Sequence, residues 1–303
     1  MAFSEPVVFL GGKFIPVHEA HVNLVDLAVV MGATVTDQLR TFRHLPFRLS
    51  DHVERFYRSS QFARITSPLS MQETTQAVES LIEQNASLIA PDEDLGVLLF
   101  LSPGQHPGYA APGHAPSPTF CIHSFTLQFA DWRPLFQTGA HVVTPPTRHV
   151  PPQCLEPKIK HRSRMHWWIA QQEAQLVDPH AIPLLLDVDG NVTETAGSNF
   201  VIVSGGSVIS PSPRNILRGV SLVTLAELCA SLGISFMERD FQLYEAIHAD
   251  EAMLPTTPYC LAPATRINGL PIGNGKPGPV FERLLQAWSK LVGLDILQQI
   301  NTQ

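Results

Sequence analysis

The stretch Pro157-Lys158-Ile159-Lys160, continued by His161-Arg162-Ser163-Arg164, carries two lysines separated by one isoleucine. On a strand, residues two apart share a face, so Lys158 and Lys160 would be equivalent there. The chain then leads into a predicted helix that continues to about Leu176. Burial at the end of a strand lowers the pKa of a lysine, because it disfavours the ammonium form, and the free amine can attack a carbonyl. A basic surface patch is the alternative, and this segment by itself favours it.

Length and composition place the chain among ordinary globular proteins. Its 303 residues are 44% hydrophobic and 16% charged, enough for one large domain or two smaller ones. A net charge of −7 argues against a nucleic-acid-binding protein, which needs a basic surface. We see no membrane-length apolar run and no leader, and therefore expect a cytoplasmic protein. The 4 cysteines and 13 histidines show no metal-ligand spacing, so we expect reduced thiols and no metal.

The order of predicted strands and helices indicates an α/β (α+β) fold in two domains. We expect a small α/β domain over residues 1–127, a connector over 128–138 and a larger domain over 139–303. Proline and glycine are dense at 102–118, which predicts a long loop in the first domain.

Local patterns predict the individual elements. Ser70 and Glu73 form a capping box that begins a helix ending near Asn85, and Ser50 is predicted to cap the helix before it. We expect strands at 7–10, 14–16, 22–24, 34–42, 96–101, 119–127, 140–144, 182–187, 191–194, 200–203, 207–210, 235–240 and 251–254. Further helices are expected over 219–231, 243–249 and 279–292.

Several features of the chain suit a pyridoxal phosphate site. That cofactor needs a lysine for an imine, a carboxylate that keeps its ring nitrogen protonated, and several donors for its phosphate. Lys160 supplies the lysine. Glu194 lies at a strand end, just before a turn of small residues that lets a flat ring approach the backbone. A surface glutamate is the ordinary alternative.

Donors for a phosphate follow later in the chain. Gly219 precedes a predicted helix start, where the N–H groups of Val220 and Ser221 and the helix dipole favour an anion. The hydroxyls of Thr256-Thr257 and the guanidinium of Arg55 could add to this set. Each has an ordinary alternative: a helix serine, turn threonines or a solvent-facing arginine. The order and spacing of these features are more specific than any one of them.

In that order, the motifs resemble the fold-type IV pyridoxal phosphate enzymes (aminotransferase class IV). These include branched-chain and D-amino-acid aminotransferases and aminodeoxychorismate lyase. The resemblance covers nearly the whole chain, and its longest motifs are highly specific. They are Phe47–Phe56, Pro157–Lys160, Leu186–Glu194, Ser198–Phe200, Ile216–Ser221 and Thr256-Thr257.

The resemblance implies a role for each matched residue. Lys160, rather than Lys158, would be the Schiff-base lysine, because only Lys160 keeps the family's distance to the following helix. Glu194 would be the partner of the pyridine nitrogen. The phosphate contacts would be Arg55, Val220, Ser221 and Thr257. The implied fold is a small α/β domain with a larger pseudo-barrel domain, normally as a homodimer.

The chain also departs from the family pattern. Met31 replaces an aromatic residue before Gly32, Thr36 replaces another, and Leu222 follows Ser221 where an arginine often stands. After Lys160, the run to Arg164 is closer to the lyase, so Arg164 would replace a residue near the cofactor hydroxyl.

The predicted strand 34–42 indicates how substrate would be held. Alternation places Thr36, Gln38 and Arg40 on one face, which in the family looks into the cleft. This polar trio, together with Thr256, suits a polar substrate that bears a carboxylate. A structural ion pair of Arg40 is the alternative.

Three functions follow from this interpretation. The first is an aminotransferase that moves an amino group between an amino acid and a 2-oxo acid through a Lys160 Schiff base. The second is aminodeoxychorismate lyase, which eliminates pyruvate. The third is a non-catalytic relative that binds a ligand, suggested by the losses at Met31, Thr36 and Leu222.

Overall fold

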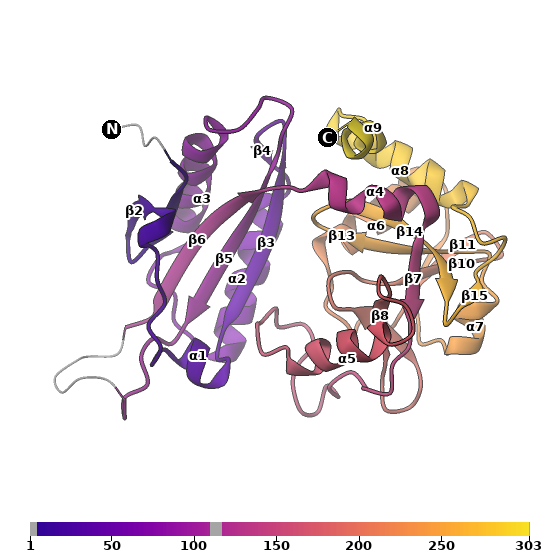
Figure 1. Cartoon of the computed structure of the whole chain (residues 1–303), viewed down its shortest axis with the longest axis horizontal. Helices are drawn as coiled ribbons and strands as arrows, with labels where there is room; N and C mark the ends of the chain where they lie inside the picture. The colour runs from indigo at the N-terminus through magenta and orange to yellow at the C-terminus, as the bar shows by residue number, and fades with distance from the viewer. Residues whose placement is uncertain (1–4, 110–116, 303) are drawn as a thin grey trace. The chain divides into compact units, whose positions relative to one another are not determined.

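The computed structural model describes residues 5–109 and 117–302. Part of the predicted proline-rich loop, residues 110–116, lies outside this description. The chain divides into two compact units (Figure 1). The first unit comprises Met1–Leu127 and Ile159–Ser163, and the second comprises Gln128–Lys158 and Arg164–Gln303. The predicted mixed α/β class is confirmed.

The first unit is an antiparallel sheet with helices on one face. The sheet has the order β2-β1-β6-β5-β3-β4. Its strands are β1 (Val7–Leu10), β2 (Lys13–Pro16), β3 (Val35–Phe42), β4 (Leu45–Pro46), β5 (Leu95–Ser102) and β6 (Thr119–Thr126). Its helices are η1 (Val17–Glu19), α1 (Leu27–Met31), α2 (Leu49–Ala63) and α3 (Met71–Ala86). In Figure 1, α2 and α3 run along the sheet formed by β3, β5 and β6.

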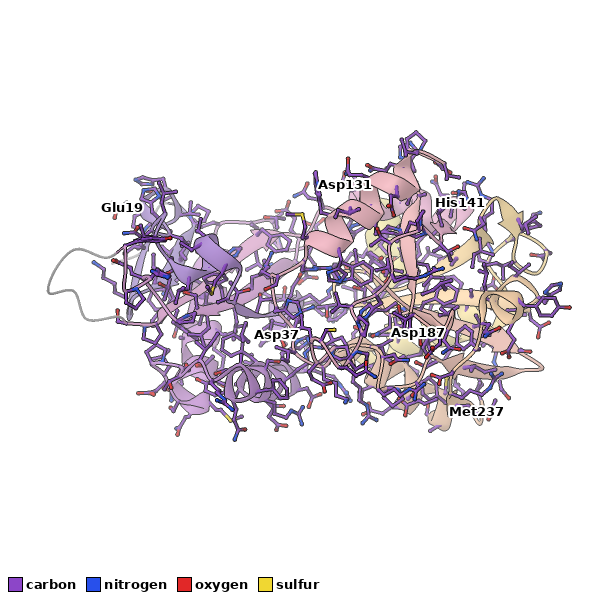
Figure 2. All side chains as sticks on the ribbon, turned by 90° about the horizontal axis from the view of Figure 1, so that it is seen from below. Glu19, Asp37, Asp131, His141, Asp187 and Met237 are labelled. Carbon is purple, nitrogen blue, oxygen red and sulfur yellow. The ribbon has the colours of Figure 1, made fainter. Side chains whose placement is uncertain are left out.

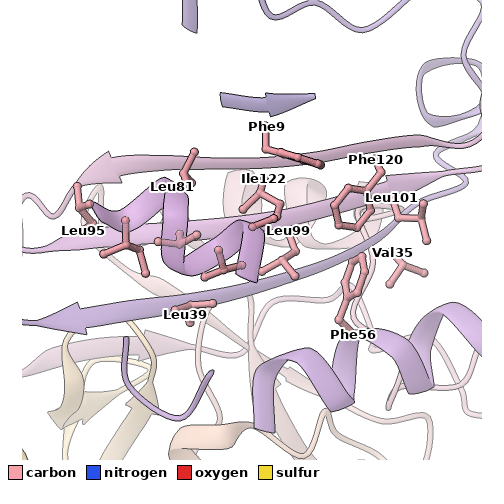
Figure 3. Packing of buried hydrophobic residues seen from close by; sticks show 14 of the residues in the cluster. Phe9, Val35, Leu39, Phe56, Leu81, Leu95, Leu99, Leu101, Phe120 and Ile122 are labelled. Atoms are coloured by element: carbon pink, nitrogen blue, oxygen red, sulfur yellow. The ribbon is translucent and has the colours of Figure 1, made fainter. Parts of the chain in front are cut away.

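Apolar side chains between this sheet and its helices form the core of the first unit (Figure 3). Val35 and Leu39 of β3 meet Phe56 of α2 in this core, and all three are 0% exposed. Since side chains two apart on a strand share a face, Asp37 lies on the same, helix-covered face. A carboxylate therefore lies within the core, and Figure 2 labels it.

The second unit is a mixed sheet ordered β12-β11-β10-β13-β14-β7-β8-β9, with β15 paired to β14. The strand β7 runs parallel to β8 and β14, and β11 runs parallel to β12. The strands are β7 (Ala140–Val143), β8 (Ile182–Leu186), β9 (Val192–Thr195), β10 (Val201–Ser204), β11 (Ser207–Ser210), β12 (Phe236–Glu238), β13 (Glu251–Thr256), β14 (Cys260–Ile267) and β15 (Leu270–Pro271). The helices are α4 (Phe129–Thr138), α5 (Met165–Gln175), α6 (Val220–Ser231), α7 (Leu243–Ile247), α8 (Pro279–Val292) and α9 (Ile296–Thr302).

Side chains define the tight turn between β8 and β9. Asp187 Oδ1 accepts hydrogen bonds from the N–H groups of Asp189, at 2.9 Å, and Asn191, at 2.8 Å. Its Oδ2 accepts from Asn215 Nδ2 at 3.0 Å, which ties the turn to the segment before α6. These hydrogen bonds fix the turn from which β9 and Glu194 begin.

Several predicted elements are wrong. Residues 22–24 form no strand. The helix α2 begins at Leu49, not after a Ser50 cap, because Arg48 takes the left-handed conformation with φ 53° and precedes it. The segment predicted as a connector contains the helix α4, in which Phe129 and Phe136 are buried although Pro134 lies inside, and its role as a connector stays a prediction. Among the described residues, no helix combines the length and apolarity needed to cross a membrane.

Candidate cofactor and substrate site

Lys160 lies in an irregular segment of the first unit, not on the strand expected from the sequence. Its N–H donates to Ser59 Oγ at 3.3 Å, and its carbonyl accepts from the Thr36 N–H at 2.9 Å. Ile159, immediately before it, is 8% exposed and joins the core of the first unit. These contacts fix the main chain at Lys160 between β3 and α2.

Lys158 has different surroundings. Its side chain is 55% exposed and its ammonium lies 3.1 Å from Glu156 Oε1. Exposed ion pairs of this kind contribute little to stability, and they leave the lysine in contact with water. The two lysines are therefore not equivalent, although their spacing in the sequence made them look so.

Arg55 lies in the first unit, where its guanidinium binds a buried carboxylate. Arg55 Nε and Nη2 donate to Asp37 Oδ2 and Oδ1 at 2.8 and 2.7 Å. His52 Nδ1 lies 2.7 Å from the same Asp37 Oδ1. Asp37 is 0% exposed and the Arg55 side chain 9% exposed. The paired geometry gives Arg55 one fixed orientation.

Protonation of this cluster follows from its burial and charges. Burial would raise the pKa of the Asp37 carboxyl, but the Arg55 charge and the hydrogen bonds from His52 and Arg55 hold it well below its usual range. Burial, reinforced by the charges of Arg55 and Lys160, lowers the pKa of His52 despite its hydrogen bond to Asp37. Asp37 is therefore the anion of the cluster, and His52 is neutral at physiological pH.

In the second unit, Glu194 is held by backbone and side-chain donors. Its Oε1 accepts from the Leu217 N–H at 3.1 Å, and its Oε2 accepts from Asn199 Nδ2 at 3.0 Å. Asn199 Nδ2 also donates to the Leu217 carbonyl at 2.8 Å. The Glu194 side chain is 12% exposed, and His149 Nε2 lies 3.6 Å from it. An ordinary surface glutamate is thereby excluded.

The N-terminus of α6 adjoins this carboxylate. A Cβ added at Gly219, the N-cap residue, would meet Asn199 Oδ1 at 2.4 Å, so the residue must be glycine for Asn199 to keep its place. The N–H groups in the first turn of a helix have no intrahelical acceptor. The Ser221 hydroxyl makes no hydrogen bond with another described residue, and Ser221 is 6% exposed.

The turn after Glu194 is held on several sides within the second unit. Thr256 Oγ1 donates to the Gly197 carbonyl at 2.6 Å, and Arg164 Nη2 donates to the Ala196 carbonyl. Burial raises the pKa of Tyr259 to about 12 despite a hydrogen bond to Ser198. Tyr259 therefore remains a protonated phenol that supports the same turn.

Thr257, the neighbour of Thr256, differs from it in its contacts. Its side chain is partly exposed, and its hydroxyl makes no hydrogen bond with any residue that the structure describes. Of the two threonines predicted from the sequence, Thr256 uses its hydroxyl within the fold, and the hydroxyl of Thr257 is available as a donor.

The polar trio predicted on β3 also divides. Arg40 is 1% exposed, lies 3.5 Å from Asp94 Oδ2, and stacks 3.9 Å over the Phe42 ring. This is the structural ion pair, and we correct the substrate-binding role of Arg40 on that ground. Thr36 is buried and its hydroxyl donates to the Leu99 carbonyl at 2.7 Å, whereas Gln38 is partly exposed.

Sequence reasoning missed three residues that hold the predicted ones. Asp37 received no role because it interrupts the apolar face formed by Val35 and Leu39. His52 was grouped with scattered histidines, although it lies on α2 three residues before Arg55. Asn199 stood inside a recognised motif without a role. Asp37 on the apolar face of β3 and His52 on the apolar face of α2 could have been found because buried polar side chains need partners, which each could supply to the other.

The family model described as "Amino-transferase class IV" matches residues 34–267 of this chain. Branched-chain-amino-acid aminotransferase-like protein 1 of Arabidopsis thaliana is 28% identical over 94% of this chain and 50% of its own length. The chain thus spans about half the length of that relative. D-alanine aminotransferase of Bacillus licheniformis is 26% identical over 92% of this chain and 95% of its own.

Solved structures show the same fold. The branched-chain amino acid aminotransferase of Escherichia coli superposes with a TM-score of 0.86 at 21% identity, over 95% of both chains. The branched-chain aminotransferase of Thermoproteus uzoniensis gives 0.83 at 21% identity, over 96% of both chains. Another branched-chain amino acid aminotransferase, with a TM-score of 0.83 at 22% identity, was solved as a complex with N-(5'-phosphopyridoxyl)-L-glutamate. It covers 96% of this chain and 95% of its own.

The fold and the matched residues define a fold-type IV protein. The chain belongs to the aminotransferase class IV family. The relatives named above are aminotransferases, and they give no support to the lyase alternative.

Proposed function

We propose that this chain is a pyridoxal phosphate-dependent aminotransferase that moves an amino group between an amino acid and a 2-oxo acid. The observation that carries the proposal is the arrangement around Glu194. A nearly buried carboxylate is oriented by Asn199 and by Leu217, which lies two residues before a helix N-terminus with available donors.

The donors at α6 fit a phosphate. The N–H groups of Val220 and Ser221 and the Ser221 hydroxyl are available at the start of this helix. We propose Thr257 and Arg55 as further phosphate donors. Arg55 Nε and Nη2 donate to Asp37, and Nη2 also lies 3.4 Å from His52 Nδ1, so the two N–H groups of Nη1 are left for an anion.

The carboxylate of Glu194 fits the ring nitrogen. Each of its oxygens accepts one hydrogen bond within the chain, and a carboxylate oxygen can accept two. Glu194 therefore keeps acceptor capacity for a protonated pyridine while its orientation is fixed. We propose that Glu194 holds the proton on that nitrogen.

When bound, the cofactor supplies an aldehyde that joins amines covalently and a ring that accepts electrons. Lys160 Nζ would hold the cofactor covalently. Its amine would take up the proton from the substrate Cα and return it, as a general acid and base. Positioned acid–base groups of this kind contribute roughly 10²–10⁴-fold to rate.

Substrate contacts are proposed at fewer residues than the sequence suggested. Gln38 remains a candidate because its side chain is partly exposed. We propose that Thr36 and Thr256 shape the site through main-chain and turn contacts, and that Arg164 supports the turn after Glu194. A homodimer and a cytoplasmic location also remain proposals, taken from the family pattern and the sequence.

An amino-transfer assay tests this function. The protein is mixed with cofactor, a panel of L- and D-amino acids and several 2-oxo acids, and the newly formed amino acid is measured. We expect a new amino acid only when donor and acceptor are both present, and none with Lys160→Ala. Pyruvate release from aminodeoxychorismate without any acceptor would instead identify a lyase.

A further inference from the structure

Asp37 is a charge in an apolar environment. It lies between Val35 and Leu39 on the face of β3 that packs against α2, and its exposure is 0%. Burying an unpaired carboxylate costs several kcal/mol, so its partners must fill the lone pairs of both oxygens. How these partners are arranged indicates what the charge does.

The carboxylate of Asp37 occupies one edge of the Arg55 guanidinium. Nε and Nη2 donate to the two carboxylate oxygens at 2.8 and 2.7 Å. His52 and the Gln38 N–H, at 2.7 Å, complete the contacts of Asp37 Oδ1. Arg55 Nη1 makes no hydrogen bond with a described residue. Nη2 also lies 3.4 Å from His52 Nδ1. The guanidinium edge on the Nη1 side therefore remains for an anion.

The same support reaches the main chain of Lys160. The N–H of Thr36, next to Asp37, donates to the Lys160 carbonyl at 2.9 Å. Ser59 Oγ donates to the Arg55 carbonyl at 2.9 Å and accepts from the Lys160 N–H at 3.3 Å. A displacement of Arg55 or β3 would therefore also move the main chain of Lys160.

We propose that Asp37 is a positioning residue for cofactor binding: it holds Arg55 by one edge so that the other edge receives the cofactor phosphate. This inference rests on the proposed function. The opposite role is physically reasonable as well, since a carboxylate could compete with phosphate for the arginine. The two roles predict opposite effects when the Asp37 charge is removed.

Pyridoxal, which lacks the phosphate but keeps the aldehyde, is the probe that separates phosphate binding from reaction at Lys160. Affinities of the protein for pyridoxal phosphate and for pyridoxal are measured by titrating the absorbance band of the bound aldehyde. We expect Asp37→Asn to weaken pyridoxal phosphate by roughly 10- to 100-fold, the effect of a lost charged hydrogen bond, and pyridoxal much less. In Arg55→Ala, adding Asp37→Asn should cause no further loss of phosphate preference.

Asp94→Asn is the matched control, because Asp94 is 1% exposed and pairs with a different arginine, Arg40. It should destabilise the fold and leave the preference for the phosphate unchanged. If Asp37→Asn does not fold, Asp37→Glu keeps the charge but moves the carboxylate by one methylene relative to Arg55. It should still lower the preference for pyridoxal phosphate over pyridoxal.

The possible results are distinct. A wild-type preference in a folded Asp37→Asn or Asp37→Glu variant overturns the inference, as does tighter phosphate binding. In both cases the wild-type band stands, and so does the proposed function. No band in the wild-type protein with either aldehyde would overturn the proposed function and the inference together.

Discussion

At the residue scale, side chains of one type have different surroundings and therefore different chemistry. Lys158 is 55% exposed and paired with Glu156, whereas the main chain of Lys160 is fixed by two hydrogen bonds. Arg40 neutralises Asp94 inside the first unit, whereas Arg55 keeps one edge of its guanidinium available. The residue types could be predicted from sequence motifs. Their partners could not, because Asp37 and Asp94 meet the arginines only after β3, α2 and β5 have packed.

Glu194→Gln tests the role of the oriented carboxylate. Because the amide cannot hold a proton on the ring nitrogen as a carboxylate does, we expect amino transfer to fall about 10- to 100-fold. The absorbance band of the bound cofactor should persist, since Lys160 is unchanged. Glu238→Gln, at an exposed glutamate of the same unit, is the control for the loss of a charge. Equal rates in the wild type and Glu194→Gln would remove Glu194 from the mechanism.

The pH dependence of stability tests the buried histidine. The folded state lowers the pKa of His52 below its ordinary value of 6.5, so the unfolded chain takes up a proton more readily. Stability should therefore fall as pH drops below 6.5, by up to about 1.4 kcal/mol per pH unit for one proton. Asp37, whose pKa is also lowered, stabilises the folded state fully above its ordinary value of 3.8, and its contribution is lost only as the pH falls below that value.

In His52→Gln we expect a shallower loss of stability between neutral pH and about pH 5, since no side chain titrates at that position. Urea unfolding at a series of pH values measures it. His18→Gln is the control, because the His18 side chain is 63% exposed. A His52→Gln curve parallel to the wild type would mean that His52 is protonated in the folded protein.

At the element scale, the sequence predicted what local interactions determine. The capping box at Ser70 and Glu73 is confirmed, because both partners lie within one turn of α3. The start of α2 was wrong, since the left-handed Arg48 is set by the turn that brings β4 to the helix. The strand β14 was missed for a related reason: it is buried between β13 and β7, and its apolar run has no alternation to reveal it.

Ser70→Ala measures the local contribution directly. Ser70 Oγ accepts from the Glu73 N–H at 3.2 Å, and Glu73 Oε2 accepts from the Ser70 N–H at 2.7 Å. Losing the cap should cost about 1 kcal/mol of unfolding free energy, measured by urea denaturation. Thr75→Ala on the same helix removes only a bond to the Met71 carbonyl and should be nearly neutral. A loss as large in Thr75→Ala would show that the capping box contributes nothing specific.

At the scale of the whole molecule, the order of short motifs predicted the family better than periodicity predicted the elements. The family model spans residues 34–267, and therefore includes candidate site residues from both compact units. The fold class could be inferred because these motifs keep their order along the chain. The substrate could not, because the polar face on β3 proved to be largely structural: Arg40 and Thr36 bind other parts of the first unit.

The central claim is that Lys160 binds pyridoxal phosphate covalently, and absorbance spectra of three proteins test it most directly. The wild type, Lys160→Ala and Lys158→Ala are each mixed with the cofactor and scanned into the visible range, after thermal melting has shown that they fold. We predict a band near the visible edge in the wild type and in Lys158→Ala, and none in Lys160→Ala. A band that survives Lys160→Ala, or one that depends on Lys158, would contradict the account.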